Sequence, residues 1–196
     1  MKALILVDIQ NDFLNGGALA VPNANEILPV VNQIILDYDL VVATQDWHPF
    51  NHQSFASQHL ANTIFDEIDL HGLKQTLWPD HCIQDSFGAE FHSDLNTNTI
   101  STIFRKGMNE QIDSYSGFYD NGKLLDTGLA GYLKAKNVSE VYLCGLAGDF
   151  CVKYTAIDAL QAGFKTYLID KAIRSINQDN FNQFKIDFIT QGGKII

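Results

Sequence analysis

A cysteine at a predicted strand-to-helix turn is the side chain best placed to do covalent chemistry. Cys151 follows residues 141–150, which are typical of a buried strand, a glycine-containing turn and the opening of a helix. At a helix N-terminus the helix dipole and the free N–H groups favour the thiolate, the nucleophilic form of cysteine. The pattern indicates a nucleophile, although a single cysteine in an apolar setting is more often an inert core residue.

Two charged residues end earlier apolar runs in the same manner. Asp8 follows the run 3–7, and Lys106 follows the run 99–104. Ligands of open α/β sheets bind beyond the carboxyl ends of the strands, so neighbouring strands would bring an acid, an amine and a thiol into one crevice. Each residue alone has a plainer reading, as a cap or a solvated charge. Their joint placement favours nucleophilic catalysis supported by a general base.

A second group of side chains offers nitrogen and oxygen ligands to a metal ion. It comprises Asp46, His48, His52 and His81. Three imidazoles and a carboxylate suit Zn, Fe or Mn, and Asp46 and His48 can face the same side of an extended segment. Spacing alone leaves open a simple cluster of surface histidines, because other histidines lie in or near the same region: His59, His71 and His92.

These side chains need a scaffold of parallel strands to bring them together. Short continuous apolar runs predict buried strands, and longer periodic segments predict helices. The predicted strands are 3–7, 40–44, 99–104, 140–144, 165–169 and 194–196, and the predicted helices are 27–36, 124–135, 152–162 and 180–190. Residues 46 to about 98 read as an irregular connection, of a length that is usually functional or contains short elements. The alternation predicts an α/β fold with a parallel sheet, in a single domain spanning 1–196.

Composition and charge disfavour several classes of partner. The chain has 196 residues, a net charge of −10 and only 13 Lys and Arg residues, with no basic stripe, which argues against nucleic acid and anionic membranes. No run approaches the ~20 apolar residues of a membrane span. The N-terminal apolar run is too short for a signal peptide, and neither glycine-rich nucleotide motif occurs. Three cysteines without a pairing pattern fit a reducing compartment, so the predicted location is cytoplasmic, with Cys82 and Cys144 in the core.

Five segments of the chain together resemble the nicotinamidase/pyrazinamidase branch of the isochorismatase-like cysteine hydrolases. The resemblance extends in order from about residue 3 to about residue 175. The Asp–Lys–Cys part belongs to the wider superfamily, whereas the metal segment is typical of nicotinamidases. The segments are Val7-Asp8-Ile9-Gln10-Asn11-Asp12-Phe13, Ala43-Thr44-Gln45-Asp46-Trp47-His48-Pro49-Phe50-Asn51-His52, Trp78-Pro79-Asp80-His81-Cys82, Phe104-Arg105-Lys106-Gly107 and Gly145-Leu146-Ala147-Gly148-Asp149-Phe150-Cys151-Val152.

The resemblance implies a three-layer α/β/α fold around a six-stranded parallel sheet. It implies that Asp8, Lys106 and Cys151 form a catalytic triad. It also implies that one divalent metal ion (Zn, Fe or Mn) is bound by four residues, with water completing the shell, and that three aromatic residues line the substrate pocket. The implied metal ligands are Asp46, His48, His52 and His81, and the implied pocket residues are Phe13, Trp78 and Tyr115.

The turn before the cysteine carries two further expectations. By resemblance, the backbone N–H groups of Ala147 and Cys151 form an oxyanion hole, and the peptide bond between Leu146 and Ala147 is cis. The family often has Thr or Ser where this chain has Gly148, so we expect the turn to gain backbone freedom here.

The activity implied by the resemblance is metal-dependent hydrolysis of nicotinamide to nicotinate and ammonia, as in NAD salvage, with pyrazinamide as a further substrate. Cys151 would form a thioester, with Asp8 as general acid and base and Lys106 as electrostatic support. One alternative is a superfamily amidase acting on another small amide, which the metal segment disfavours. A second alternative is a non-catalytic metal-binding or thiol-redox protein. A third is a purely structural interaction module, which would leave the long histidine-rich segment unexplained. The sequence leaves open whether the chain forms a homo-oligomer.

Overall fold

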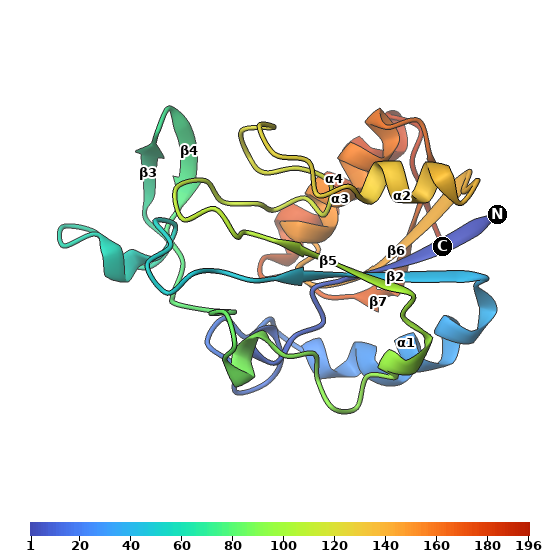
Figure 1. Cartoon of the computed structure of the whole chain (residues 1–196), viewed down its shortest axis with the longest axis horizontal. Coiled ribbons are helices and arrows are strands. Elements are labelled where there is room, and N and C mark those ends of the chain that lie inside the picture. The colour runs from blue at the N-terminus through green and yellow to red at the C-terminus, as the bar shows by residue number, and fades with distance from the viewer.

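Six parallel strands form the central sheet of the protein, which we describe over residues 1–196 from a computed structural model (Figure 1). Along the sheet they follow the order β5-β2-β1-β6-β7-β8, and every adjacent pair is parallel. All six carboxyl ends therefore meet at one edge. The strands are β1 (Lys2–Val7), β2 (Leu40–Asp46), β5 (Thr102–Lys106), β6 (Glu140–Gly145), β7 (Lys165–Ile173) and β8 (Lys194–Ile195).

Helices cover both faces of this sheet. The helix α1 (Ile27–Ile34) packs on one face, and α2 (Leu129–Ala135), α3 (Cys151–Gln161) and α4 (Gln178–Thr190) pack on the other, as Figure 1 shows. This confirms the predicted three-layer α/β/α architecture. No helix has the length and hydropathy that crossing a membrane requires.

The apolar runs form strands because both sides of the sheet are covered. In β1, Leu4 and Leu6 belong to the core beneath α1, whereas Ala3, Ile5 and Val7 belong to the core beneath the other three helices. Successive side chains of the strand thus pack into two separate cores. This explains why β1 is continuously apolar and does not alternate between apolar and polar residues.

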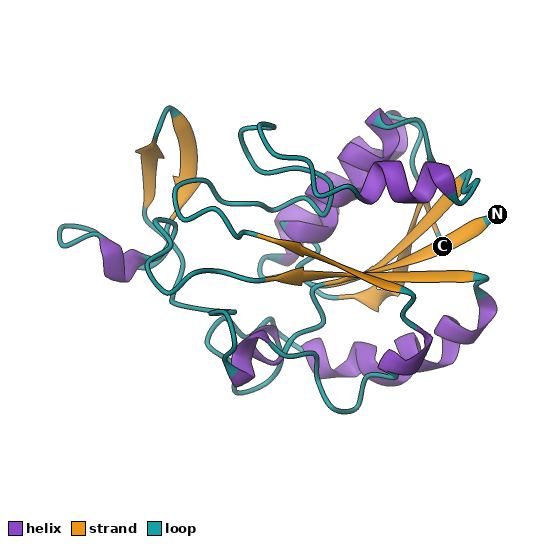
Figure 2. Cartoon of the chain, in the orientation of Figure 1, coloured by secondary structure: helices purple, strands orange, loops and turns teal.

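The direction of the sheet's connections reverses at β1. Its neighbours are β2 on one side and β6 on the other, so successive crossovers lead away from β1 in opposite directions. A crevice forms at such a switch point, beyond the carboxyl ends of the strands, and it is the usual ligand site of open α/β sheets. The strand arrowheads in Figure 2 point toward this end, where the long loops gather.

Three predicted boundaries differ from the structure by three residues or more. The helix predicted over 124–135 begins only at Leu129, because residues 120–128 form a loop in which the Asp120 carboxylate accepts the N–H groups of Leu124 and Leu125. The strand predicted over 99–104 begins at Thr102. The strand predicted over 165–169 continues to Ile173.

The long connection predicted between residues 46 and 98 contains a small antiparallel hairpin. Its strands are β3 (Glu67–Leu70) and β4 (Leu73–Thr76), joined by a two-residue turn. Both turn residues have positive φ, 54° at His71 and 83° at Gly72, as in a type I′ turn, whose twist matches that of paired strands. In Figure 1 the hairpin stands apart from the central sheet, on the side of the strand carboxyl ends.

Candidate active site and metal centre

Asp8, Lys106 and Cys151 lie together at the carboxyl edge of the sheet. Asp8 follows β1, Lys106 ends β5 and Cys151 begins α3. The Lys106 Nζ lies 3.0 Å from Asp8 Oδ2 and donates to Cys151 Sγ at 3.5 Å. A carboxylate oxygen of Asp8 lies within 4.8 Å of the same sulfur. Three segments far apart in the sequence thus bring an acid, an amine and a thiol into contact, all of them buried.

The two oxygens of the Asp8 carboxylate have different partners. The φ of Asp8 is 49°, in the left-handed region, which is uncommon outside glycine and often marks functional positions. The Thr44 hydroxyl donates to Oδ1 at 2.6 Å, whereas Oδ2 lies 3.0 Å from the Lys106 ammonium. Burial raises the pKa of Asp8 despite the opposing charge of Lys106. The Asp8 carboxylate is therefore suited to accept a proton.

The Cys151 thiol differs from the thiolate that its position at the N-terminus of α3 predicts. Burial raises the pKa of Cys151 well above its usual range against the opposing charge of Lys106, and the carboxylates of Asp8 and Asp46 raise it further. The resting sulfur therefore keeps its proton, because a buried site that holds two carboxylates disfavours another negative charge. Nucleophilic attack then requires a base beside the sulfur.

Lys106 remains charged although it is fully buried. Its ammonium donates to Asp46 Oδ1 and to the Ser114 carbonyl, both at 2.9 Å. Burial alone would lower the pKa of Lys106, but Asp46 and Asp8 raise it well above its usual value. The buried ammonium therefore compensates two carboxylates at once.

The four residues predicted as metal ligands lie next to this triad. The ligand atoms of Asp46, His48 and His81 all lie within 4.8 Å of one another. His48 Nε2 is 3.2 Å from Asp46 Oδ1, and His81 Nε2 is 3.6 Å from Asp46 Oδ2. His52 packs its ring on that of His48, with 4.5 Å between the centroids. All four side chains are buried.

The imidazole rings are oriented as metal-binding histidines usually are. His48 Nδ1 lies 3.0 Å from the Gly107 carbonyl, and His81 Nδ1 lies 2.8 Å from the Pro79 carbonyl. His52 Nδ1 lies 2.7 Å from the Ser54 hydroxyl. The Gly107 and Pro79 carbonyls can accept an Nδ1–H from His48 and His81, which leaves the lone pair of these two rings on Nε2. In His52, Nδ1 instead accepts the backbone N–H of Ser54 at 3.1 Å.

Two of these Nε2 atoms make no hydrogen bond within the chain. Those of His48 and His52 are buried without any hydrogen bond, an arrangement that is costly unless another group binds them. Burial also lowers the pKa of His52 to about 4, so its ring is neutral at neutral pH and can act as a ligand. The donor set fits a divalent metal ion.

The turn from Leu146 to Cys151 leaves backbone donors unused on both sides of Gly148. The Leu146–Ala147 peptide bond is cis, as expected. The N–H of Gly148 donates to the Arg174 carbonyl at 2.8 Å, and that of Phe150 to the Ala147 carbonyl at 3.1 Å. The N–H groups of Ala147 and Cys151 donate to no backbone acceptor. They are available to a developing oxyanion near the sulfur.

A small cavity joins the triad to the metal ligands. The three aromatic residues predicted to bind substrate, Phe13, Trp78 and Tyr115, line it together with Asp46 and Cys151. Its volume of about 20 Å³ holds roughly one water molecule. A substrate ring therefore enters only when some of the lining side chains move.

Three buried polar residues of this site were not assigned roles from the sequence. Thr44 donates to the Asp8 carboxylate, and its signal in the sequence is a hydroxyl within an apolar run. Gln10 accepts the N–H of Asp46 at 2.8 Å and donates to the Asp46 carbonyl at 2.7 Å, which fixes that residue's backbone. The Asp113 carboxylate lies within 4.8 Å of ring nitrogens of His48 and His52, and no spacing indicates it.

The remaining histidines and cysteines lie outside the site. His59 and His71 contact Gln53, and His92 lies beside Asp94. Cys82 and Cys144 are buried and unpaired, in agreement with their predicted place in the core.

Comparison with known proteins gives consistent matches over nearly the whole chain. Residues 2–196 match the isochorismatase domain family. The chain is 49% identical over 177 residues to a nicotinamidase of Acinetobacter baylyi, which covers 90% of this chain and 83% of that protein. A solved nicotinamidase/pyrazinamidase of Acinetobacter baumanii is 46% identical with a TM-score of 0.97, and the match covers 100% of this chain and 95% of that one. A pyrazinamidase of Pyrococcus horikoshii, solved in complex with zinc, is 38% identical with a TM-score of 0.81, and the match covers 100% of this chain and 98% of that one.

Proposed function

Because the chain belongs to the isochorismatase family, we propose that it is a cysteine amidase that hydrolyses nicotinamide to nicotinate and ammonia, and pyrazinamide in the same way. One observation carries the proposal. A single cavity is lined by Cys151, by the proposed metal ligands Asp46 and His81, and by aromatic side chains. This arrangement suits an aromatic ring whose carboxamide reaches the sulfur.

The first chemical step joins the sulfur to the carboxamide carbon. The Asp8 carboxylate takes the thiol proton of Cys151 while the sulfur attacks, and the carbonyl π electrons move to the oxygen. The free N–H groups of Ala147 and Cys151 bind this oxyanion, and the loss of one such donor typically costs about 10²–10³-fold in rate.

The second step releases ammonia and then nicotinate. Asp8 returns its proton to the amide nitrogen, the C–N bond breaks, and a thioester remains on Cys151. Asp8 then removes a proton from a water molecule that attacks the thioester carbon, and the proton passes to the departing thiolate. Lys106 stays charged throughout and stabilises the carboxylate form of Asp8 between the proton transfers.

Asp46, His48, His52 and His81 would hold one divalent cation, for which Zn, Fe and Mn are the candidates. When bound, it supplies a Lewis-acidic site for the pyridine nitrogen and so orients the ring. The zinc in the pyrazinamidase relative supports this assignment. Phe13, Trp78 and Tyr115 fix the plane of the ring by contact with its faces and edges.

The proposal extends to domain organisation and compartment. The family match over residues 2–196 supports a single catalytic domain. Three free cysteines support a reducing compartment, and we assign the chain to the cytoplasm.

The test is ammonia release by the purified protein from nicotinamide, pyrazinamide and a series of aliphatic amides, with metal analysis of the same preparation. We expect ammonia from both heteroaromatic amides and about one metal ion per chain. Release from aliphatic amides alone would identify a different amidase of the family. A metal-loaded protein that releases no ammonia from any amide would contradict the proposal.

A further inference from the structure

The hairpin β3–β4 sends one polar side chain toward the cavity. Gln75 is only 2% exposed, whereas its neighbour Lys74 is exposed. Successive side chains of a strand point to opposite sides, so Gln75 faces inward from β4 while Lys74 faces solvent. A buried amide is stable only if its polar atoms have partners.

The partners of Gln75 include two residues that line the substrate cavity. The Nε2 of Gln75 carries two hydrogens and lies within hydrogen-bond distance of three acceptors: Asp113 Oδ2 at 2.9 Å, the Tyr115 hydroxyl at 3.0 Å and the Thr76 carbonyl at 2.7 Å. Asp113 and Tyr115 both belong to the cavity wall. One amide therefore holds two walls of the site.

Those two walls serve different halves of the site. The Asp113 carboxylate lies within 4.8 Å of ring nitrogens of His48 and His52, on the metal side. The Tyr115 hydroxyl also accepts the indole N–H of Trp78 at 3.3 Å, on the aromatic side. Gln75 thus connects the metal side with the aromatic side through direct hydrogen bonds.

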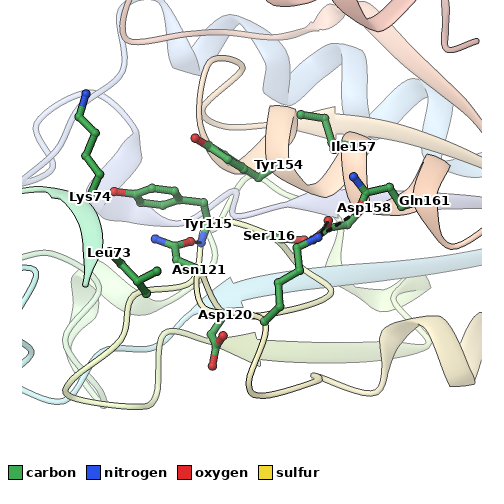
Figure 3. Close-up of a pocket in the computed structure, with 11 residues that line it drawn as sticks. Leu73, Lys74, Tyr115, Ser116, Asp120, Asn121, Tyr154, Ile157, Asp158 and Gln161 are labelled. Atoms are coloured by element: carbon green, nitrogen blue, oxygen red, sulfur yellow. Dashed lines mark hydrogen bonds and ion pairs between the residues drawn. The ribbon is translucent and has the colours of Figure 1, made fainter. Parts of the chain in front are cut away.

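Polar contacts hold the hairpin here because packing does not. A cavity of about 410 Å³ separates Leu73 and Lys74 of the hairpin from Tyr154 and Ile157 of α3, with Tyr115 beside it (Figure 3). Of the eight strand residues in the hairpin, only Leu70 and Gln75 are buried. The amide of Gln75 is accordingly a main attachment of the hairpin to the site.

We propose that Gln75 is a positioning residue. By holding Asp113 and Tyr115, it sets the affinity of the histidine cluster for a divalent metal and the fit of the substrate ring. The proposal rests on the proposed function for its kinetic part and adds to that function a determinant of metal and substrate affinity. Its metal-binding part does not depend on turnover.

The test compares Gln75→Leu, which keeps most of the volume but removes the amide, with Lys74→Leu on the exposed side of the same strand. In Gln75→Leu we expect KM for nicotinamide to rise about tenfold with kcat changed by less than about threefold, since a charge-assisted hydrogen bond and its neighbour are lost. The Zn²⁺ affinity of the metal-free protein, measured by competition with a chromophoric chelator, is expected to fall about tenfold. Lys74→Leu is expected to match the unmodified protein in both.

A double-mutant cycle separates positioning from general loosening. If Gln75 acts on the metal site through Asp113, the effect of Gln75→Leu on Zn²⁺ affinity disappears in an Asp113→Asn background. Full additivity of the two changes would contradict the proposal, as would unchanged KM and Zn²⁺ affinity in Gln75→Leu. Should Gln75→Leu fail to fold, Gln75→Asn replaces it, because the shorter side chain keeps an amide that no longer extends to Asp113 and Tyr115. The same changes in KM and Zn²⁺ affinity are then expected. Absence of ammonia release by the unmodified protein would overturn only the proposed function, because the Zn²⁺ titrations still judge Gln75.

Discussion

Lys106 pairs with Asp46 as closely as with Asp8, at 2.9 Å and 3.0 Å. The first contact joins it to the proposed metal ligands and the second to the proposed triad. The sheet order explains the sharing, because β2, which ends at Asp46, lies between β1 and β5. The two functional groups are therefore one electrostatic unit, and a change of charge in one alters the other.

Replacing Lys106 with methionine should separate turnover from metal binding. We expect Lys106→Met to lose at least about 10³-fold in kcat/KM, because Asp8 and the reacting sulfur lose their shared cation. Two buried carboxylates lose their partner, so the metal-free protein should lose about 3–5 kcal/mol of unfolding free energy in urea. Zn²⁺ should bind at least as tightly as before, since a competing cation is gone.

The control for this change is Lys123→Met. Lys123 pairs with Asp158 at 2.6 Å but is half exposed, so its loss should cost at most about 1 kcal/mol. Weakened Zn²⁺ binding in Lys106→Met would contradict the shared-cation interpretation.

Removing the proposed nucleophile should abolish turnover while leaving the fold intact. We expect Cys151→Ala to reduce ammonia release from nicotinamide by at least about 10³-fold, because no other side chain near the carboxamide can form the acyl intermediate. Cys144→Ala, the matched change at a buried cysteine outside the site, should keep kcat within about twofold. Comparable activity of the two variants would rule out the thioester mechanism.

Gly107 should be essential for the orientation of a metal ligand. Its φ is +68°, and an added Cβ would overlap the imidazole of His48. Gly107→Ala should therefore weaken Zn²⁺ binding about tenfold or more, as measured by chelator competition. Gly16 has a similar φ of +88° but open space around it, so Gly16→Ala should cost about 1–2 kcal/mol of stability without affecting Zn²⁺ affinity. Equal effects on metal binding in the two variants would show that backbone strain, rather than His48, is responsible.

Metal removal should lower both activity and stability. Dialysis against a strong chelator leaves the Nε2 atoms of His48 and His52 buried without partners. We expect ammonia release to stop and to return on addition of Zn²⁺, Fe²⁺ or Mn²⁺. Metal at about 100 times its Kd should raise the unfolding free energy by about 2.7 kcal/mol, which calorimetry can measure. A chelated protein with full activity would exclude the templating role of the metal.

Gly148 should resist replacement by the residues common at its position in the family. An added Cβ would lie 2.9 Å from atoms of Ile173 and Phe181, which fill the space beside the turn. Gly148→Thr should therefore cost about 1–3 kcal/mol of stability by overpacking, seen as a lower Tm. Phe181→Leu should recover part of this loss in the double variant. A stabilised Gly148→Thr would instead support the expectation of excess backbone freedom at this turn.

The sequence predicted best the parts of the site that follow apolar runs. Asp8 and Lys106 were found because a buried strand and the charged residue at its end are adjacent in the chain. The hairpin was not resolved, since its strands are only four residues long and mostly exposed, with no apolar alternation. The helix start at Leu129 was misplaced because Leu124 and Leu125 are apolar yet exposed.

The charge state of Cys151 and the packing around Gly148 also required the three-dimensional structure. Both depend on residues distant in the sequence, such as Asp46 beside the sulfur and Phe181 beside the turn. A local pattern reports neither the burial of a group nor the charges that surround it.

The central position of β1 also governs when the protein can become functional during folding. β1 comes before the other strands in the chain, yet Val7 pairs with Gly145, far along the sequence. The strand that lies between β1 and β5 comes from a third segment. Sheets built from such distant pairings fold slowly, because the chain loses loop-closure entropy before the stabilising contacts form. Helical signal should therefore return early in refolding, whereas turnover should return only with the last pairing of the sheet and thus report its completion.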